Sequence, residues 1–187
     1  MNKTAIIIPT RLAAQRLPNK PLKLINNKEM ITHVYEAAVK SNVGEVIVAT
    51  PDKQIIETIN NVGGRAVITK ENHETGTDRI FEVFSNLLNE EPDVIINLQG
   101  DMPNINSEAI SNLAIYMKKN KCDIATLASK LSSAREIEDQ NVVKVAVKDK
   151  FTNNSFLNAV DFFRKGKKME NVYHHIGIYA FTNEALI

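Results

Sequence analysis

The chain contains one cysteine, Cys122, and this scarcity excludes several kinds of site. A single thiol cannot form an internal disulfide or any of the multi-cysteine zinc patterns. A chain without disulfides also fits a reducing compartment. Long apolar runs are absent as well, since the run Ala5–Ile8 is far too short for a signal peptide or a membrane span. We therefore expect a cytoplasmic protein that does not act in a membrane.

An excess of charge of either sign is also missing. The 23 basic and 22 acidic residues nearly cancel, so no overall field would draw the chain onto nucleic acid or a membrane surface. Any site for an anion must therefore be local. With 187 residues, 43% of them hydrophobic, the chain can bury a core as one domain. We predict a single domain over residues 1–187, with halves at 1–121 and 122–187.

Short β-branched runs alternate with helical patterns over the first half. The expected strands are Thr4–Pro9, Glu45–Ala49, Ala66–Ile68 and Val94–Leu98. Apolar stripes at helical spacing lie between or after them: Ile31, Val34, Tyr35 and Ala38; Ile80, Phe84, Leu87 and Leu88; Ile110, Leu113, Ala114 and Met117. Alternation of this kind predicts an α/β fold, a Rossmann-like mixed and mostly parallel sheet with helices on both faces.

The helix after the second strand has clear boundary signals. Thr50 is predicted as its N-cap, with Pro51 at the first helical position and Gly63-Gly64 as its end. From about residue 122 the pattern changes to strands with little helix between them. The expected strands are Ile124–Leu131, Val142–Val147 and Tyr173–Phe181, with an irregular polar segment over Lys148–Asn171. The second half is therefore predicted to be richer in β structure.

A short basic loop follows the first strand. The strand ends at Pro9, and Arg11, Arg16 and Lys20 then fall within ten residues without an acidic residue between them. Open α/β sheets bind ligands outside the carboxyl ends of their strands. Arginine can grip two phosphate oxygens at once, and lysine supplies a compact point charge. The loop therefore predicts a polyphosphate site, most simply for a nucleoside triphosphate whose nucleotide is transferred.

The alternative is a basic loop that is only solvated. Pro9, Pro18 and Pro21 speak against it, because they stiffen a segment that a mere connection would leave loose. The loop lacks the G-x-x-x-x-G-K-[ST] pattern of a P-loop and the G-x-G-x-x-G pattern of a dinucleotide-binding fold. Neither of those classes fits.

An acidic residue, Asp101, follows the buried run Val94–Leu98, with Gly100 before it and Pro103 shortly after. A rigidly held carboxylate suits Mg²⁺, which takes one or two carboxylates and completes its shell with substrate phosphates. The alternative is a turn or cap residue before the helix at Ser107. In a parallel sheet Asp101 would share one edge with the basic loop, which favours the metal site.

A third polar segment, His73–Arg79, leads into the Ile80 helix. Thr75 and Asp78 match a capping box, and capping alone would explain them. The same helix N-terminus, from Thr75 through Gly76 and Thr77 to Asp78, could also present N–H groups and hydroxyls to a base or ribose. Its place after a strand's carboxyl end favours a ligand-facing role.

These three segments together resemble one family. They resemble three motifs of the 3-deoxy-manno-octulosonate (KDO) cytidylyltransferases, or CMP-KDO synthetases, in order and spacing. The matching segments are Ile6–Leu22, His73–Arg79 and Asn97–Pro103. Weaker similarity continues through Asn141–Val145 and His175–Tyr179. The resemblance implies a nucleotidyltransferase with a glycosyltransferase-A-like fold. It also implies transfer of CMP from CTP to KDO, with release of pyrophosphate, for lipopolysaccharide biosynthesis.

The resemblance also implies roles for particular residues. Arg11, Lys20 and Asp101 would form the catalytic set, with Asp101 holding the cofactor Mg²⁺. The nucleotide would be bound by Pro9, Arg11, Arg16, Lys20, Thr75, Gly76, Thr77 and Asp78. The sugar acid would be contacted by Gln99 and His175. CTP and KDO would be the substrates of a homodimer.

Two departures from the family pattern keep alternatives open. Asn158 stands where the family carries an arginine for the sugar carboxylate, so another acidic sugar such as a sialic acid is one alternative. Thr182–Ile187 is predicted as the first turn of a helix, where family members continue for several tens of residues. We therefore expect a C-terminally truncated member whose second half is an incomplete sugar-binding and dimerisation part. An inactive CTP-binding remnant is the other alternative.

Overall fold

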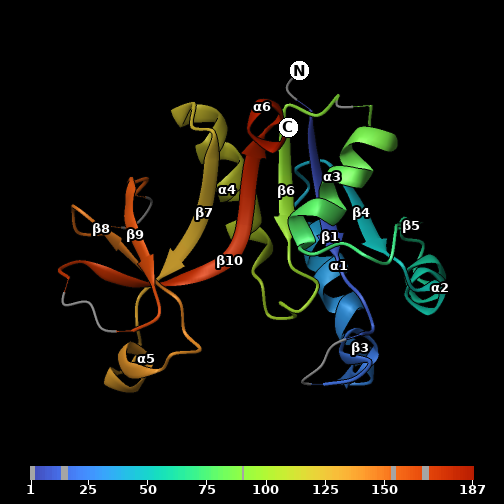
Figure 1. Ribbon diagram of the computed structural model, residues 1–187, viewed down its shortest axis with the longest axis horizontal. Helices are drawn as coiled ribbons and strands as arrows, with labels where there is room; N and C mark the ends of the chain where they lie inside the picture. Colours follow the sequence, from blue (N-terminus) through green and yellow to red (C-terminus); the bar gives the residue numbers. More distant parts are fainter. Residues whose placement is uncertain (1–2, 14–16, 90, 153–154, 166–168) are drawn as a thin grey trace. The chain divides into compact units, whose positions relative to one another are not determined.

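The computed structural model describes residues 3–13, 17–89, 91–152, 155–165 and 169–187 (Figure 1). The chain forms two compact units, the first made of Met1–Ala125 and Ile178–Ile187 and the second of Thr126–Gly177. The strand β10 (Val172–Thr182) begins in the second unit and ends in the first. The single domain with halves at 1–121 and 122–187 stays a prediction.

The sheet of the first unit is mixed and mostly parallel, as predicted. Its parallel strands lie in the order β5 (Ala66–Ile68), β4 (Glu45–Thr50), β1 (Thr4–Pro9) and β6 (Val94–Leu98), and β10 pairs antiparallel with β6. From β1 the chain moves outward through β4 and β5, and it then crosses back to β6 on the other side of β1. The strand order therefore reverses between β1 and β6, where α/β sheets place their ligands.

Helices cover both faces of this sheet, which confirms the predicted fold class. The helices of the first unit are α1 (Met30–Lys40), α2 (Lys53–Asn61), α3 (Gly76–Asn86), α4 (Ser107–Asn120) and the single turn α6 (Asn183–Leu186). In Figure 1, α3 lies in front of β1, β4 and β6, which it contacts, and α1 and α4 pack together behind the sheet. Successive residues of a strand point to opposite faces, and every residue of β1 and β6 is buried.

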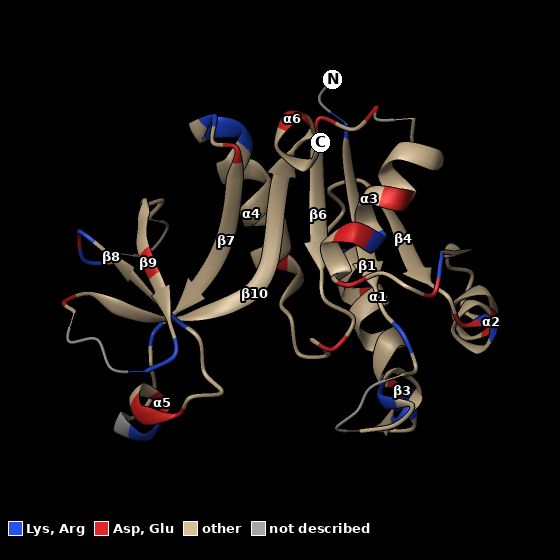
Figure 2. Ribbon diagram, viewed as in Figure 1, with Lys and Arg blue, Asp and Glu red and all other residues tan. Residues whose placement is uncertain are grey.

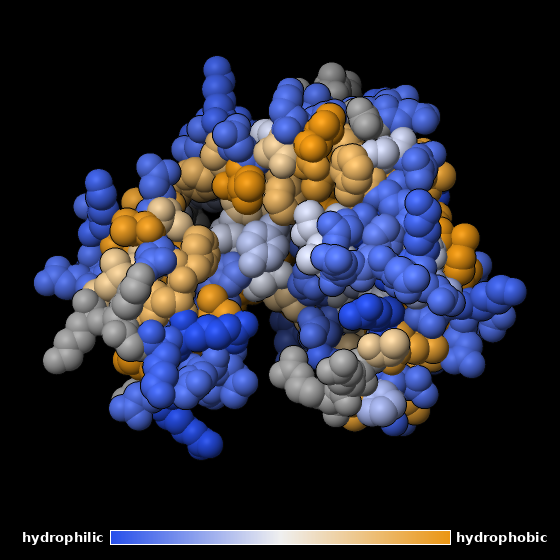
Figure 3. All heavy atoms as spheres, in the orientation of Figure 1, coloured by the Kyte–Doolittle hydropathy of each residue, from blue (hydrophilic) through white to orange (hydrophobic). Residues whose placement is uncertain are grey.

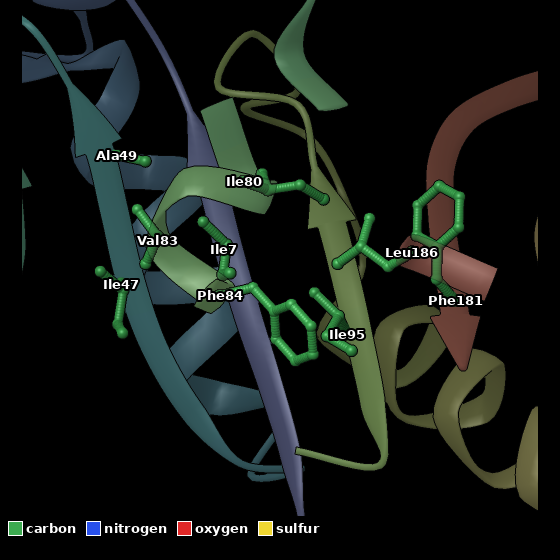
Figure 4. Packing of buried hydrophobic residues seen from close by; sticks show 9 residues of the cluster. All are labelled: Ile7, Ile47, Ala49, Ile80, Val83, Phe84, Ile95, Phe181 and Leu186. Atoms are coloured by element: carbon green, nitrogen blue, oxygen red, sulfur yellow. The ribbon is translucent and has the colours of Figure 1, made fainter. Parts of the chain in front are cut away.

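The core between the sheet and α3 contains two residues of the predicted stripe, Ile80 and Phe84, and Leu88 packs against it. Leu87, the fourth residue of that stripe, is exposed. Ile80, Val83 and Phe84 of α3 pack on the strands, and Figure 4 shows the cluster from close by. Its other members are Ile7, Ile47, Ala49, Ile95, Phe181 and Leu186. Burial of side chains of this size contributes about 1.5–3 kcal/mol each. This packing fixes the strands whose ends carry the polar segments.

The second unit is mainly antiparallel, which confirms a second half richer in β structure. It contains β7 (Ile124–Ser129), which begins in the first unit, together with α5 (Ala134–Glu138), β8 (Lys144–Val147) and β9 (Ala159–Phe163). The strand β8 pairs antiparallel with both β9 and β10, and β7 also pairs with β10. The prediction that Lys148–Asn171 is irregular throughout is wrong, because β9 lies inside it. Its residues are at most half-buried, so they lack the apolar signal of an inner strand.

Thr50 is not a helix N-cap, as the sequence predicts, but the last residue of β4. It pairs with Ile68 of β5, and its carbonyl accepts a hydrogen bond from Thr69 N at 2.9 Å. The helix α2 begins three residues later, with Asp52 as its N-cap and Pro51 outside it. The ladder to β5 therefore prevails over the capping preference of threonine. The predicted stop at Gly63-Gly64 is confirmed, because α2 ends at Asn61 with Val62 as its C-cap, and Gly63 directly after it has a φ of 74°.

The surface carries charges of both signs, as Figure 2 shows for α2 and α3. Apolar side chains are also exposed in the second unit, including Val160 and Phe162 of β9, and the face in Figure 3 shows hydrophobic atoms there. Within the described ranges, the structure contains no helix with the length and apolar character needed to span a membrane.

Candidate functional site

A pocket of about 1080 Å³ opens in the first unit, where β1 and β6 end and α3 begins. Its described lining comes from all three polar segments of the sequence: Pro9, Thr10, Arg11, Ala13, Leu17, Lys20, Pro21, Met30, His73, Thr75, Gly76, Arg79, Gln99, Gly100 and Asp101. The volume suits a ligand as large as a nucleoside triphosphate. The structure therefore brings together Pro9, Arg11, Lys20, Thr75, Gly76, Gln99 and Asp101 of the predicted site.

The basic loop is held in place by backbone hydrogen bonds on both sides. Thr10 N donates to Ala49 O at 3.0 Å, and Leu12 N donates to Oδ2 of Asp52 at 2.8 Å. The loop closes where Asn19 N donates to Leu12 O at 3.3 Å. Asn19 has the left-handed φ of 54° that asparagine tolerates, and the short 3₁₀ turn η1 (Lys20–Leu22) follows it. Arg16, predicted to support this loop, lies outside the described residues.

After η1 the chain makes a small hairpin before α1. Its strands β2 (Leu24–Ile25) and β3 (Lys28–Glu29) are joined by Asn26 and Asn27, both with positive φ. Two such residues make the turn that matches the twist of a hairpin. The carbonyl of Lys23 accepts Met30 N at 2.9 Å, so the hairpin ties η1 to the start of α1.

Lys20 and Asp101 meet at the edge of the sheet. Lys20 Nζ lies 2.7 Å from Oδ2 of Asp101, and the two side chains are 35% and 53% exposed. A pair as exposed as this contributes about 0–1 kcal/mol, so a ligand can separate it at little cost. Phosphate oxygens can then take the ammonium group, while the carboxylate becomes available to a cation. The placement of the two residues at one edge agrees with the prediction.

The N-terminus of α3 is closed by a capping box. Thr75 Oγ1 accepts Asp78 N at 3.1 Å, and Oδ2 of Asp78 accepts Thr75 N at 2.8 Å. The hydrogen bonds from Thr75 lower the pKa of Asp78. Thr75 and Gly76 are among the described lining residues of the pocket, whereas Thr77 and Asp78 are not. The capping role is therefore present, and the backbone N–H groups of the first turn remain suited to an anion.

Arg79 is a buried cation beside the pocket. Its side chain is 3% exposed and donates to Thr69 Oγ1, to Lys70 O at 2.8 Å and to Glu71 O at 3.4 Å. Burial lowers the pKa of Arg79, and the positive charge of Arg11 lowers it further. The two guanidinium groups therefore act on one another electrostatically, and both face the same pocket. Clustered positive charge of this kind attracts phosphate.

His73 is anchored by a carboxylate of α3. Its Nε2 hydrogen-bonds Oε2 of Glu82, which also accepts Lys70 N at 3.1 Å. Burial works to raise the pKa of Glu82, but the hydrogen bonds from His73 and Lys70 outweigh it and the pKa is lowered. The pair fixes the segment between β5 and α3, and with it the wall of the pocket that His73 lines.

Replacing Glu82 with glutamine should make stability less dependent on pH. A carboxyl whose pKa is lowered by folding stabilises the protein above the ordinary pKa of about 4.5, and this contribution disappears as the pH falls through the folded value. We expect Glu82→Gln to be less stable than the parent at pH 7 and equally stable near pH 3. Urea unfolding at several pH values measures the difference. If the parent and Glu82→Gln differed in their free energy of unfolding by the same amount at pH 7 and at pH 3, the lowered pKa of Glu82 would be contradicted.

A buried amide connects two of the polar segments. Asn97 is 1% exposed within the apolar strand β6, and its Oδ1 accepts Gln99 Nε2 at 3.1 Å. On its other side Asn97 Nδ2 donates to Thr77 Oγ1 at 3.5 Å. Gln99 lines the pocket. Asn97 therefore links the first turn of α3 to a residue of the pocket wall by two hydrogen bonds.

His175, the predicted contact of the sugar, belongs to the second unit. It is 8% exposed on β10, its Nε2 lies 3.0 Å from Thr126 Oγ1, and its ring meets Phe162 edge to face. Burial lowers the pKa of His175, with His174 as a smaller cause. Burial therefore favours the neutral form of this imidazole. A role toward a sugar stays a prediction for this residue.

The sequence does not predict the supporting contacts of Asp52, Arg79 and Asn97. Asp52 holds the basic loop, Arg79 holds the segment before α3, and Asn97 accepts a hydrogen bond from Gln99. Arg79 and Asn97 do lie inside the motifs that point to the site. Asn97 has a local signal, since an amide inside an apolar run needs a partner. Asp52 has none, because its bond to Leu12 depends on the pairing of β1 with β4.

The carboxylate of Asp101 fits a magnesium ion better than a metal with a full protein ligand set. No group of three or more His, Cys, Asp and Glu side chains suited to a metal occurs in the part of the chain that the structure describes. Mg²⁺ does not need one, because it is usually bound by one or two carboxylates together with substrate phosphates and water. A half-exposed carboxylate beside a basic pocket large enough for a nucleoside triphosphate offers this arrangement.

Comparison with known proteins gives a consistent result. A family model described as Cytidylyltransferase matches residues 5–187. The 3-deoxy-manno-octulosonate cytidylyltransferase of Brucella canis is 37% identical over 187 residues, covering 98% of this chain and 74% of the relative. The corresponding protein of Brucella anthropi is 37% identical over 190 residues, covering 98% and 75%.

Solved structures share the fold. The structure of CMP:2-keto-3-deoxy-manno-octonic acid synthetase complexed with CTP matches with a TM-score of 0.87 and 36% identity, covering 99% of this chain and 76% of that one. A Thermus thermophilus structure described as mannose-1-phosphate geranyltransferase matches with a TM-score of 0.71 at 13% identity, and this likeness concerns the fold alone.

Proposed function

The chain belongs to the cytidylyltransferase family, and from this premise we propose that it transfers CMP from CTP to 3-deoxy-D-manno-octulosonate (KDO). The products are CMP-KDO, for lipopolysaccharide biosynthesis, and pyrophosphate. The observation that carries the proposal is the pocket of the first unit, where Arg11, Lys20 and Asp101 line one cavity. Relatives with 37% identity over 98% of the chain carry the name of this activity.

In this proposal the triphosphate of CTP lies along the basic loop. Arg11 and Lys20 neutralise its oxygens, and Arg79 adds positive charge from another wall of the same pocket. Thr75 and Gly76 present the N-terminus of α3 to the nucleotide, and Pro9 bounds the cavity beside them. We also propose that the nucleotide is bound by Thr77, Asp78 and Arg16. Asp78 would act through the capping box.

The reaction requires no nucleophile from the protein. The anomeric hydroxyl of KDO attacks the α-phosphorus and gives up its proton to solvent as the new P–O bond forms. The bond from the α-phosphorus to the oxygen that bridges to the β-phosphate breaks, and pyrophosphate leaves. Phosphoryl chemistry of this kind depends on positioning and on charge neutralisation. Mg²⁺, held by Asp101, would supply charge neutralisation at the phosphates when bound. Arg11 and Lys20 hold the leaving pyrophosphate in line, and Gln99 and His175 are the proposed contacts of the sugar acid.

The test is a coupled assay with CTP, KDO and Mg²⁺ that measures pyrophosphate, with CMP-KDO identified by mass spectrometry. We expect pyrophosphate only when both substrates are present. Calorimetry with CTP separates the alternatives, since binding without turnover would indicate a CTP-binding remnant. Absence of both binding and turnover would contradict the proposal.

A second acceptor sugar is a candidate because of Asn158. This residue is exposed in the second unit and stands at the position of an expected arginine. An amide cannot pair with a sugar carboxylate as a guanidinium does. Running the same assay with a sialic acid and other acidic sugars shows which acceptor is used. A homodimer is proposed as the assembly, and analytical ultracentrifugation tests it.

Replacing Gly100 with alanine should slow the reaction. A Cβ at Gly100 would lie 2.9 Å from Thr10 Cβ and 3.1 Å from Pro9 O, so the turn that carries Asp101 would have to move away from β1. Displacements of about 1 Å at a reacting site can cost roughly 10²-fold in rate. We expect kcat to fall by about ten-fold or more. Gly177→Ala is the control, because no atom of the described residues lies within 4 Å of its added Cβ and its φ is not positive.

A further inference from the structure

The amide of Asn97 is a polar group buried inside an apolar strand. It lies in the middle of β6, whose other residues are all apolar, and is 1% exposed. It pairs with Ile7 of β1 and with Tyr179 of β10 in the register of the sheet. A polar side chain at such a place costs free energy unless its hydrogen bonds are made. The amide of Asn97 hydrogen-bonds Thr77 and Gln99, and Gln99 lines the pocket.

The amide of Asn97 donates one hydrogen bond, to Thr77, and accepts one, from Gln99. Asn97 Nδ2 donates to Thr77 Oγ1 at 3.5 Å, so its Oδ1 is turned toward Gln99, where it accepts Nε2 at 3.1 Å. The amide nitrogen of Gln99 is therefore engaged on the side of the sheet. Within the described part of the chain no hydrogen bond to the carbonyl oxygen Oε1 of the same amide is found, so Oε1 can accept one from a ligand in the pocket that Gln99 lines. An amide oxygen accepts hydrogen bonds and donates none.

We propose that Asn97 is a positioning residue that sets the amide of Gln99, so that the pocket presents a hydrogen-bond acceptor to a donor group of the substrate. This inference rests on the proposed function. The donor has two possible sources there, the exocyclic amine of cytosine and a hydroxyl of the acceptor sugar. A site built around an acceptor discriminates against a ligand that offers another acceptor, since two unpaired oxygens would then face each other.

The decisive experiment is a double-mutant cycle. Asn97→Leu keeps the approximate size and removes both hydrogen bonds, and Gln99→Ala removes the group that Asn97 orients. If Asn97 acts through Gln99, the loss in kcat/KM from Asn97→Leu is about ten-fold in the parent and disappears in the Gln99→Ala background. Equal losses in both backgrounds would overturn the proposal, because they would show a role that does not pass through Gln99.

The source of the donor follows from the same variants. If the acceptor faces cytosine, Asn97→Leu lowers the preference for CTP over UTP and leaves the KM of the sugar unchanged. If it faces the sugar, the KM of the sugar rises and the nucleotide preference stays. Ile96→Val, at the neighbouring buried position of β6, is the packing control, and it should lower the melting temperature without either effect.

Thr77→Val keeps the test decisive if Asn97→Leu does not fold. Thr77 is exposed, and this change removes the acceptor of Asn97 Nδ2 without opening the core. A loss of kcat/KM that is smaller in the Gln99→Ala background than in the parent supports the proposal, whatever part Thr77 contributes by its own proposed contact with the nucleotide. A loss of the same size in both backgrounds overturns it. If the parent enzyme neither binds CTP nor releases pyrophosphate, the proposed function fails. If the parent is active and the cycle is additive, only the positioning role fails.

Discussion

Replacing Asp101 with asparagine should lower pyrophosphate release by about 10²–10³-fold and leave the fold unchanged. The proposed role of this carboxylate is to hold Mg²⁺ against the triphosphate, and an amide is a far weaker ligand for a hard cation. Stability should change little, because the pair of Asp101 with Lys20 is partly exposed and contributes about 0–1 kcal/mol. Steady-state assays and thermal unfolding measure the two effects.

Binding of CTP without a metal gives a second readout on Asp101. Removing a negative charge beside the triphosphate should leave the affinity for metal-free CTP equal or slightly higher, since Lys20 no longer has a competing carboxylate. With Mg²⁺ or Mn²⁺ present the affinity should instead fall. Asp149→Asn is the matched control, because Asp149 is exposed and lies in the second unit. Full activity in Asp101→Asn would contradict the assignment of the metal to this residue.

The sequence is informative about the inner strands for a physical reason. The runs at β1 and β6 are covered on both faces, so all their residues except Thr4 and Asn97 are apolar, and their bounds agree with the prediction. At the periphery the signal weakens. The residues of β9 are half-buried at most. The sequence around Thr50 is compatible both with a helix N-cap and with the end of a strand, which it is in the structure. There the ladder of hydrogen bonds to neighbouring strands decides, and a single segment does not reveal its neighbours.

The site shows the same division between local and tertiary information. The basic loop, the turn after β6 and the start of α3 can be placed at one edge, because carboxyl ends of parallel strands meet there. The supporting contacts cannot be found this way. The bond from Leu12 to Asp52 depends on the order of β1 and β4, and the grip of Arg79 on Lys70 and Glu71 depends on how α3 lies on the sheet.

Arg79→Met should combine a large loss of stability with weaker binding of CTP. The guanidinium is 3% exposed and serves Thr69 Oγ1, Lys70 O and Glu71 O. Methionine fills similar space but leaves these acceptors without a donor, and an unsatisfied buried polar group costs about 1–3 kcal/mol. We expect the free energy of unfolding to fall by about 2–4 kcal/mol. Denaturant titration measures it, with Arg65→Met as the exposed control.

The two roles of Arg79, holding the segment before α3 and adding charge to the pocket, separate in Arg79→Lys. Lysine keeps the positive charge beside Arg11 but cannot reach three acceptors with the planar fork of a guanidinium. If charge governs CTP binding, Arg79→Lys should bind CTP nearly as well as the parent and still lose stability. If the held segment governs binding, affinity should fall together with stability in both variants. Parent-like stability in Arg79→Met would contradict the contacts themselves, because Thr69, Lys70 and Glu71 would then need no donor.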